Sequence, residues 1–88
     1  MDEKKYLVII TRTVQKTLSK LPSPIATKLE SAMLKLEDNP RPPGCKKLKG
    51  REAYRIREGD YRIIYEIEDK VLRVVVVDVG NRKDIYRD

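Results

Sequence analysis

The sequence contains no histidine and only one cysteine among its 88 residues. Histidine is the commonest general acid–base group and metal ligand, so its absence excludes histidine-pair ribonuclease chemistry, catalytic triads and most zinc hydrolases. A single cysteine excludes a disulfide framework and a cysteine-built metal site. The sequence therefore predicts a reduced protein with no metal and no small-molecule cofactor.

Long apolar runs are missing as well. No segment approaches the roughly 20 residues needed to cross a bilayer, and no signal-peptide pattern opens the chain. We therefore expect a soluble, cytoplasmic protein without a membrane partner. Because domains commonly contain roughly 100–150 residues, residues 1–88 are expected to form a single domain.

Positive charge is concentrated in the middle of the chain. The whole sequence has 20 Lys and Arg against 14 Asp and Glu, a net charge of +6. Eight of these cations and three of the acids lie in residues 41–62, which therefore carry +5 of the excess. Such clustering indicates a phosphate-bearing partner, and an ordinary solvated basic surface is the alternative.

The spacing of apolar residues in the first half predicts a strand followed by two helices. Residues 6–10 are a β-branched run, read as a buried strand. A first helix is expected to begin near Thr11 or Thr13 and to carry its apolar stripe as far as Leu21. Ser23 is expected to cap a second helix, and residues 38–40 to end it, which makes an αα-hairpin.

The second half reads as a stiff basic connection over residues 40–50 and then three strands. These are expected at residues 54–57, 61–67 and 71–77, with a further tight turn at Gly80 and Asn81. The last of the three is so uniformly apolar that it should lie inside the sheet. The predicted fold class is α+β: a small antiparallel sheet with an N-terminal αα-hairpin packed on one face, in the order β-α-α-β-β-β.

A parity argument places three arginines together. In an antiparallel hairpin with a two-residue or four-residue loop, opposed residue numbers sum to an odd value. Arg55 and Arg57 therefore share a face with Arg62, and the other face is apolar enough to receive the helices. Arginine's planar fork suits phosphate; the alternative is a solvated face with weak surface ion pairs.

Other candidate sites are weaker. Four carboxylates could be considered as a metal cluster: Glu66, Glu68, Asp69 and Asp78. Glu68 and Asp69 fall in an expected turn, so we expect no metal site. Cys45 has cationic neighbours but no histidine partner for a thiol nucleophile. Tyr86 either stacks on a nucleobase or seals the edge of the core.

Several short segments, taken in order, resemble one protein family. They are Lys47-Leu48-Lys49-Gly50, Tyr54-Arg55-Ile56-Arg57, Gly59-Asp60-Tyr61-Arg62-Ile63-Ile64-Tyr65 and Val79-Gly80-Asn81-Arg82-Lys83-Asp84-Ile85-Tyr86. Together they resemble the RelE/ParE superfamily of toxins from type II toxin–antitoxin pairs, over roughly Tyr6 to Tyr86. The resemblance implies a RelE-like fold, a cognate antitoxin as partner and, for RelE members, the ribosome and mRNA as targets.

The resemblance also implies roles for particular residues. RelE-type cleavage runs by attack of a ribose 2′-OH on the adjacent phosphate in the ribosomal A site. Transferred to this sequence, the catalytic positions are Arg57, Arg62, Arg82 and Tyr86. The expected RNA-binding positions are Arg55, Lys46, Lys47, Lys49, Arg51 and Lys83. Arg55 stands where relatives often carry a lysine proposed as general base; arginine stays protonated near neutral pH, so Arg55 is assigned to binding and the base is unassigned.

Two features depart from the family pattern. Asn81 stands where many relatives have histidine or lysine, and the sequence leaves no room for the C-terminal helix of some RelE toxins. An antitoxin is therefore expected to cover the cationic face with an acidic segment, or to lay an amphipathic helix on the toxin. The alternative functions are a ParE-like inhibitor of DNA gyrase without nuclease activity, and a passive RNA-binding module or degenerate toxin.

Overall fold

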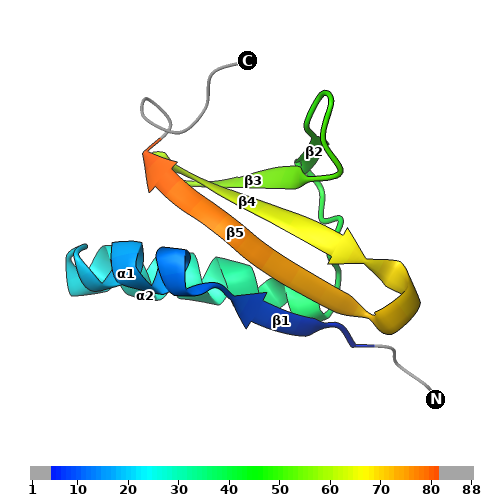
Figure 1. Cartoon of the computed structure of the whole chain (residues 1–88). Coiled ribbons are helices and arrows are strands. Elements are labelled where there is room, and N and C mark those ends of the chain that lie inside the picture. The colour runs from blue at the N-terminus through cyan, green and yellow to red at the C-terminus, as the bar shows by residue number, and fades with distance from the viewer. Residues whose placement is uncertain (1–4, 82–88) are drawn as a thin grey trace.

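Two helices and five strands form within residues 5–81, the part of the chain that the computed structural model describes (Figure 1). The strands are β1 (Leu7–Ile10), β2 (Lys46–Lys47), β3 (Tyr54–Glu58), β4 (Tyr61–Glu68) and β5 (Arg73–Asn81). The helices are α1 (Arg12–Ser19) and α2 (Ser23–Leu34), and the short 3-10 turns are η1 (Lys35–Glu37) and η2 (Asp69–Val71). This order confirms the predicted α+β class.

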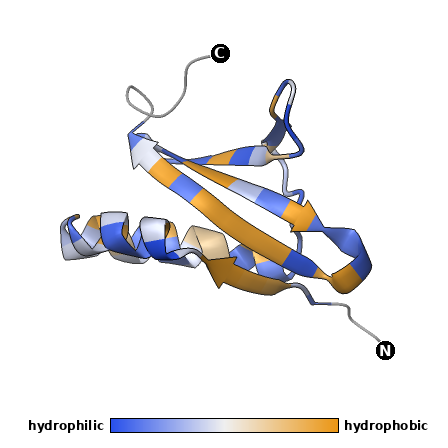
Figure 2. Ribbon diagram, viewed as in Figure 1, coloured by the Kyte–Doolittle hydropathy of each residue, from blue (hydrophilic) through white to orange (hydrophobic). Residues whose placement is uncertain are grey.

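The five strands form one sheet in the order β1-β5-β4-β3-β2. The last three strands make the predicted antiparallel meander, and β1 joins it in parallel to β5, with Leu7 opposite Arg73. β5 therefore lies inside the sheet, as its uniformly apolar sequence predicts. Figure 2 shows the result as an almost continuously hydrophobic β1 beside the hydrophobic middle of β5.

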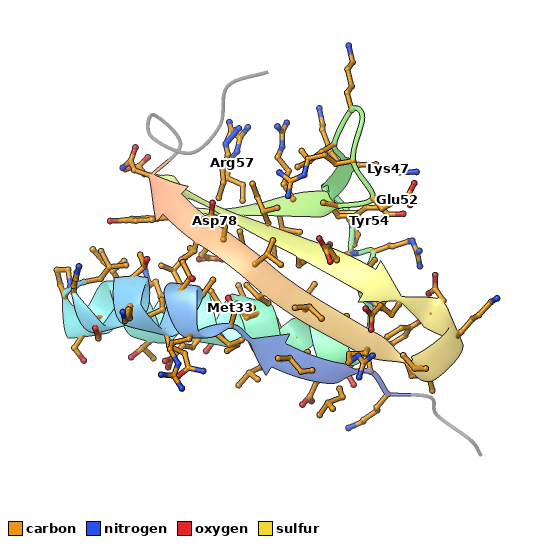
Figure 3. All side chains as sticks on the ribbon, viewed as in Figure 1. Met33, Lys47, Glu52, Tyr54, Arg57 and Asp78 are labelled. Atoms are coloured by element: carbon orange, nitrogen blue, oxygen red, sulfur yellow. The ribbon has the colours of Figure 1, made fainter. Side chains whose placement is uncertain are left out.

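Both helices cover one face of the sheet, and the opposite side, here called the outer face, carries the loop after β2 (Figure 1). The buried core between helices and sheet contains Val14, Leu18, Leu29, Met33, Leu36, Ile63, Tyr65, Val74, Val76 and Val79. Burial of these apolar surfaces supplies the main driving force for packing the layers. Figure 3 shows Met33 beneath the sheet, on the helix side.

The structure corrects two expected elements at the ends of the sheet. Lys46–Lys47, expected within an irregular connection, forms the short strand β2, because Lys46 pairs with Arg55 and Lys47 with Tyr54. Gly80 and Asn81, expected in a tight turn, continue β5 because β4 is long enough to pair with both.

The expected helix boundaries also change. Ser23 was expected to cap α2 but is its first residue, with Pro22 at the cap position and no side-chain capping hydrogen bond. α1 ends at Ser19, before Leu21. The Thr11 hydroxyl donates to the backbone oxygen of Val76 at 2.9 Å instead of capping α1, so it holds the start of the helix to β5.

A polar clasp closes the end of the sheet farthest from the β3–β4 turn. Arg41 binds both carboxylate oxygens of Asp69, at 3.0 and 3.2 Å, and the Tyr6 hydroxyl donates to the same carboxylate at 2.8 Å. The Arg41 guanidinium also lies over the ring of Tyr54, 5.2 Å from its centroid. Nearby, the fully buried Tyr65 donates its hydroxyl to the Pro40 carbonyl at 2.7 Å. These contacts hold the proline-rich segment against the sheet.

Candidate nucleic-acid interface

The turn between β3 and β4 contains two residues, Gly59 and Asp60, as the parity argument requires. Gly59 has a φ of 61°, a left-handed conformation that glycine adopts without a Cβ penalty. Arg57 pairs directly with Arg62, and Arg55 with Ile64, so their summed residue numbers are odd. The predicted grouping of the three arginines on one side of the hairpin is confirmed. We call this part of the outer face, defined by Arg55, Arg57 and Arg62, the arginine face.

The three arginines differ in burial. Arg57 is exposed, Arg55 is half-buried, and Arg62 is only 8% exposed. A buried guanidinium is costly unless neighbouring groups interact with it, and Arg62 does have such an interaction. Arg57 points away from the helices (Figure 3) and is the arginine most open to a ligand.

A second apolar cluster sits on the outer face beside the arginines. Leu48 and Ala53 pack over Ile64, with Val77 at the cluster's edge. Leu48 is 8% exposed and Ala53 is 1% exposed. This cluster was not predicted from the sequence. It fixes the segment of residues 46–53, here called the basic loop, above the sheet.

The basic loop carries four of the cations expected to bind RNA. Lys46, Lys47, Lys49 and Arg51 are all exposed. By register, Lys46 shares the side of Arg55, whereas Lys47 shares the side of Tyr54. Lys47 pairs with Glu52 at 3.6 Å, a contact between exposed groups that contributes little to stability (Figure 3). The loop thus adds exposed positive charge next to the arginine face.

A β-bulge interrupts the pairing of β4 with β5. Tyr65 pairs with Val76 but Ile64 pairs with Asp78, which leaves Val77 as the extra residue. Val76 and Val79 are both buried under the helices, although residues three apart on a regular strand point to opposite faces. The bulge resolves this conflict by shifting the alternation by one residue.

The bulge places Asp78 on the outer face. Asp78 is exposed, and Figure 3 shows it on the same side of the sheet as Arg57. Its Oδ1 accepts the backbone N–H of Val79 at 2.9 Å. From the sequence, Asp78 was a candidate only for metal binding. The buried valines on either side of Asp78 differ in position by an odd number. That difference could have indicated the bulge and the place of Asp78 on the outer face.

Three of the expected site residues, Arg82, Lys83 and Tyr86, lie outside the described residues. Within residues 5–81, no group of three or more potential ligands could hold a metal ion. In the same range, no helix is long and apolar enough to span a membrane.

A groove of about 790 Å³ lies at the free edge of β3, away from the centre of the arginine face. Its walls come from α2, the 42–44 segment and residues 56–58. Lys28, Lys35 and Arg57 in its lining stand against Asp38 and Glu58, so the charge is nearly balanced. A phosphate ligand is therefore expected at the arginine face, where cations are gathered, rather than in this groove.

Comparisons with known proteins agree with this architecture. Residues 8–86 match the family described as the ParE toxin of the type II toxin–antitoxin system parDE. The chain is 39% identical to Toxin RelG and 34% identical to Toxin RelE, both of Mycobacterium tuberculosis. The RelG alignment covers 93% of this chain and 97% of RelG; the RelE alignment covers 98% and 91%.

A solved structure extends the likeness to three dimensions. The crystal structure of the toxin–antitoxin complex RelBE2 from Mycobacterium tuberculosis contains a chain that matches with a TM-score of 0.81. The identity is 29%, and the match covers 94% of this chain and 98% of that one.

Proposed function

Because this chain belongs to the RelE/ParE superfamily of type II toxins, and its curated relatives are RelE-type toxins, we propose that it is a ribosome-dependent endoribonuclease. In this proposal it cleaves mRNA in the ribosomal A site, in the cytoplasm. The observation that carries the proposal is the arginine face, where Arg55, Arg57 and Arg62 are gathered on one side of a hairpin. Arg57 is the exposed member of the face and would make the first contact with an RNA strand.

The two opposed arginines would act on the scissile phosphate. Arg57 and Arg62 stand on one rung; the exposed Arg57 offers its forked donor group, and Arg62, 8% exposed, adds positive charge beside it. When the 2′-OH attacks, negative charge grows on the phosphate oxygens, and pre-positioned cations stabilise that charge more in the transition state than in the ground state. Arg55, one rung away, would hold the RNA backbone.

Three proposed residues follow the described part of β5. Arg82 would neutralise the leaving 5′-oxygen, and Tyr86 would stack on a base and orient the 2′-OH for in-line attack. Lys83 would add a phosphate contact. Their support is the family resemblance of the segment from Val79 to Tyr86.

The basic loop would bind the RNA that surrounds the cleaved codon. Lys46, Lys49 and Arg51 are exposed, and Leu48 holds them beside the arginine face. Contacts of lysine and arginine with phosphates supply affinity without sequence information. Positioning by the ribosome would then bring the codon to a site that has no histidine.

A cognate antitoxin is the second proposed partner. The outer face also carries an apolar part, where Leu7 is 63% exposed and Ile9 is 36% exposed. These side chains alternate with Val8 and Ile10, which pack on the core, so they lie on the same face of the sheet as the arginines. An antitoxin segment with apolar and acidic residues would cover both parts and block access to RNA. The related RelBE2 structure is itself a toxin–antitoxin complex.

Primer extension on an mRNA held in purified translating ribosomes tests the nuclease. We expect new 5′ ends within A-site codons, none on naked RNA, and none when the nucleotide before the cut carries a 2′-deoxy sugar. Active ribosomes and folded protein without new ends would refute the proposal.

The match to the ParE family supports one alternative, inhibition of DNA gyrase without RNA cleavage. Purified gyrase distinguishes the two directly. Loss of supercoiling with intact message would establish the alternative, and the arginine face would then be a protein-binding surface.

A further inference from the structure

The proposed cleavage requires a group that accepts the proton of the attacking 2′-OH. Arginine keeps its proton near neutral pH, and the chain has no histidine. Lysine, tyrosine and cysteine side chains ordinarily keep their protons near neutral pH as well. We therefore consider the carboxylates of the arginine face for this role.

Among the described residues, the strand register shows which nearby carboxylates lie on the outer face and how far each is from Arg62. Glu58 pairs with Tyr61 on the helix side of the hairpin, and Asp60 lies in the turn. Glu66 is on the outer face, but it pairs with Val75, two rungs from Arg62. Asp78 is on the outer face one rung from Arg62, because it pairs with Ile64.

The spacing of the rungs fits a phosphodiester. Arg62 stands between Arg57 and Gly80, and the next rung runs from Arg55 through Ile64 to Asp78. Rungs that share a face are about 6.6 Å apart along the strand and neighbouring strands about 4.8 Å apart. With a phosphate on Arg57 and Arg62, a preceding ribose that runs toward β5 would lie near Asp78, whereas Glu66 would be about 13 Å along β4.

The Asp78 side chain is suitably oriented. Its Oδ1 is held by the backbone N–H of Val79 at 2.9 Å, and the residue is exposed, so Oδ2 can receive a ligand proton. The charged side chains toward it from neighbouring elements are cationic except for Glu66 and Glu52. By register they are Arg55 and Arg57 on β3, Arg62 and Glu66 on β4, and Lys46 on β2, and the exposed Lys49, Arg51 and Glu52 belong to the basic loop above this face.

We propose that Asp78 is the general base of the cleavage, an inference that rests on the proposed nuclease function. The 2′-oxygen forms a bond to phosphorus while its proton passes to the Asp78 carboxylate. The bond from phosphorus to the 5′-oxygen breaks, and that oxygen takes a proton from water. The products are a 2′,3′-cyclic phosphate and a 5′-hydroxyl, and protonated Asp78 returns its proton to solvent.

The test measures single-turnover cleavage of ribosome-bound mRNA as a function of pH. Asp78→Asn keeps the side-chain shape and an oxygen that can accept the Val79 N–H, so its thermal unfolding should match that of the wild type. We expect cleavage at neutral pH to fall at least 100-fold, the scale of general-base catalysis. Glu66→Gln, a matched change on the same face, should cleave like the wild type.

The pH profile separates a base from a structural residue. With a carboxylate as the base, the wild-type rate should be nearly flat between pH 6 and 8. Without a base, attack depends on hydroxide, and the Asp78→Asn rate should rise about tenfold per pH unit. An unchanged rate, or a slower rate with an unchanged pH profile, would overturn the role of Asp78. Failure of the wild type to cleave at any pH would instead overturn the nuclease proposal.

Discussion

Arg57 and Arg62 lie directly opposite each other across β3 and β4, although like charges so placed repel. Arg57 is exposed and Arg62 is 8% exposed, so one guanidinium lies in the sheet surface and the other stands over it. An anion that binds both would relieve the repulsion. In the proposed function, the scissile phosphate is that anion.

Replacing the exposed member should affect chemistry and leave the fold intact. We expect Arg57→Ala to lower the single-turnover rate on ribosome-bound mRNA by about 100- to 1,000-fold, as for loss of one donor to a developing anion. Arg12→Ala removes an exposed arginine at the start of α1, on the helix side of the sheet, and is the control. Equal cleavage by both variants would remove Arg57 from the site.

Leu48 should hold the basic loop in place. Leu48→Ala removes the largest contact of that loop with Ile64 and Val77, and loss of a buried leucine costs about 2–5 kcal/mol in larger cores. We expect the low end here, together with faster tryptic cleavage after Lys47, Lys49 and Arg51. Leu34→Ala, at a leucine that is 48% exposed, should leave the digestion rate unchanged. Equal digestion of the two variants would show that Leu48 does not anchor the loop.

The buried hydroxyl of Tyr65 should stabilise the fold at neutral pH. Tyr65→Phe leaves the Pro40 carbonyl without its 2.7 Å donor, a loss of about 1–3 kcal/mol measurable by urea unfolding. Burial and the neighbouring Cys45 raise the pKa of Tyr65 above its usual value of 10.0.

That raised pKa gives the effect a pH dependence. The folded state favours the neutral phenol. The contribution of Tyr65 to the free energy of unfolding is therefore complete below about pH 10, and it declines as the pH rises through the pKa of Tyr65 in the folded state. The stability gap between wild type and Tyr65→Phe should therefore narrow above pH 10. Tyr61→Phe, at a half-buried tyrosine, is the comparison. A gap that widens with pH would contradict this assignment.

Asp69 should contribute to stability with the opposite pH dependence. Hydrogen bonds from Arg41 and then Tyr6 lower the pKa of the Asp69 carboxyl. The contribution is present above about pH 4, where the unfolded carboxyl ionises, and is lost as the pH falls through the lowered folded-state value. Asp69→Asn should lower the urea midpoint slightly at pH 7 and match the wild type at pH 2.

A suitable reference for that measurement is Asp38→Asn. Asp38 forms only a 3.8 Å ion pair with Lys5 between largely exposed side chains. The urea midpoint of Asp38→Asn should stay close to that of the wild type at both pH 7 and pH 2. If Asp38→Asn and Asp69→Asn behave alike, the clasp contributes nothing specific.

The hairpin could be predicted from the sequence because its geometry depends on residues that are close together in the chain. A two-residue turn and alternating side chains determine which face Arg55, Arg57 and Arg62 occupy, and both can be read from residue order. The apolar face toward the helices follows from the same alternation.

The features that sequence reasoning missed depend on contacts between distant segments. Strand β2 is held against the sheet because Leu48 packs on Ile64. Residues 46–53 alone do not indicate that Leu48 contacts Ile64. The bulge depends on how β5 aligns with both β4 and the helices. Asp78 was therefore visible in the sequence as an acid but could not be assigned to a face.

The parallel pairing of β1 with β5 also sets an order of assembly. The Thr11 hydroxyl donates to the Val76 carbonyl 65 positions later, so the sheet edge closes only after β5 has been synthesised. Contacts so distant in sequence form late and slow folding. The same strand β5 carries Asp78 and lies beside Arg62. A nascent chain therefore lacks the proposed site until β5 is in place, so the proposed activity would have to wait for the synthesis and pairing of that strand.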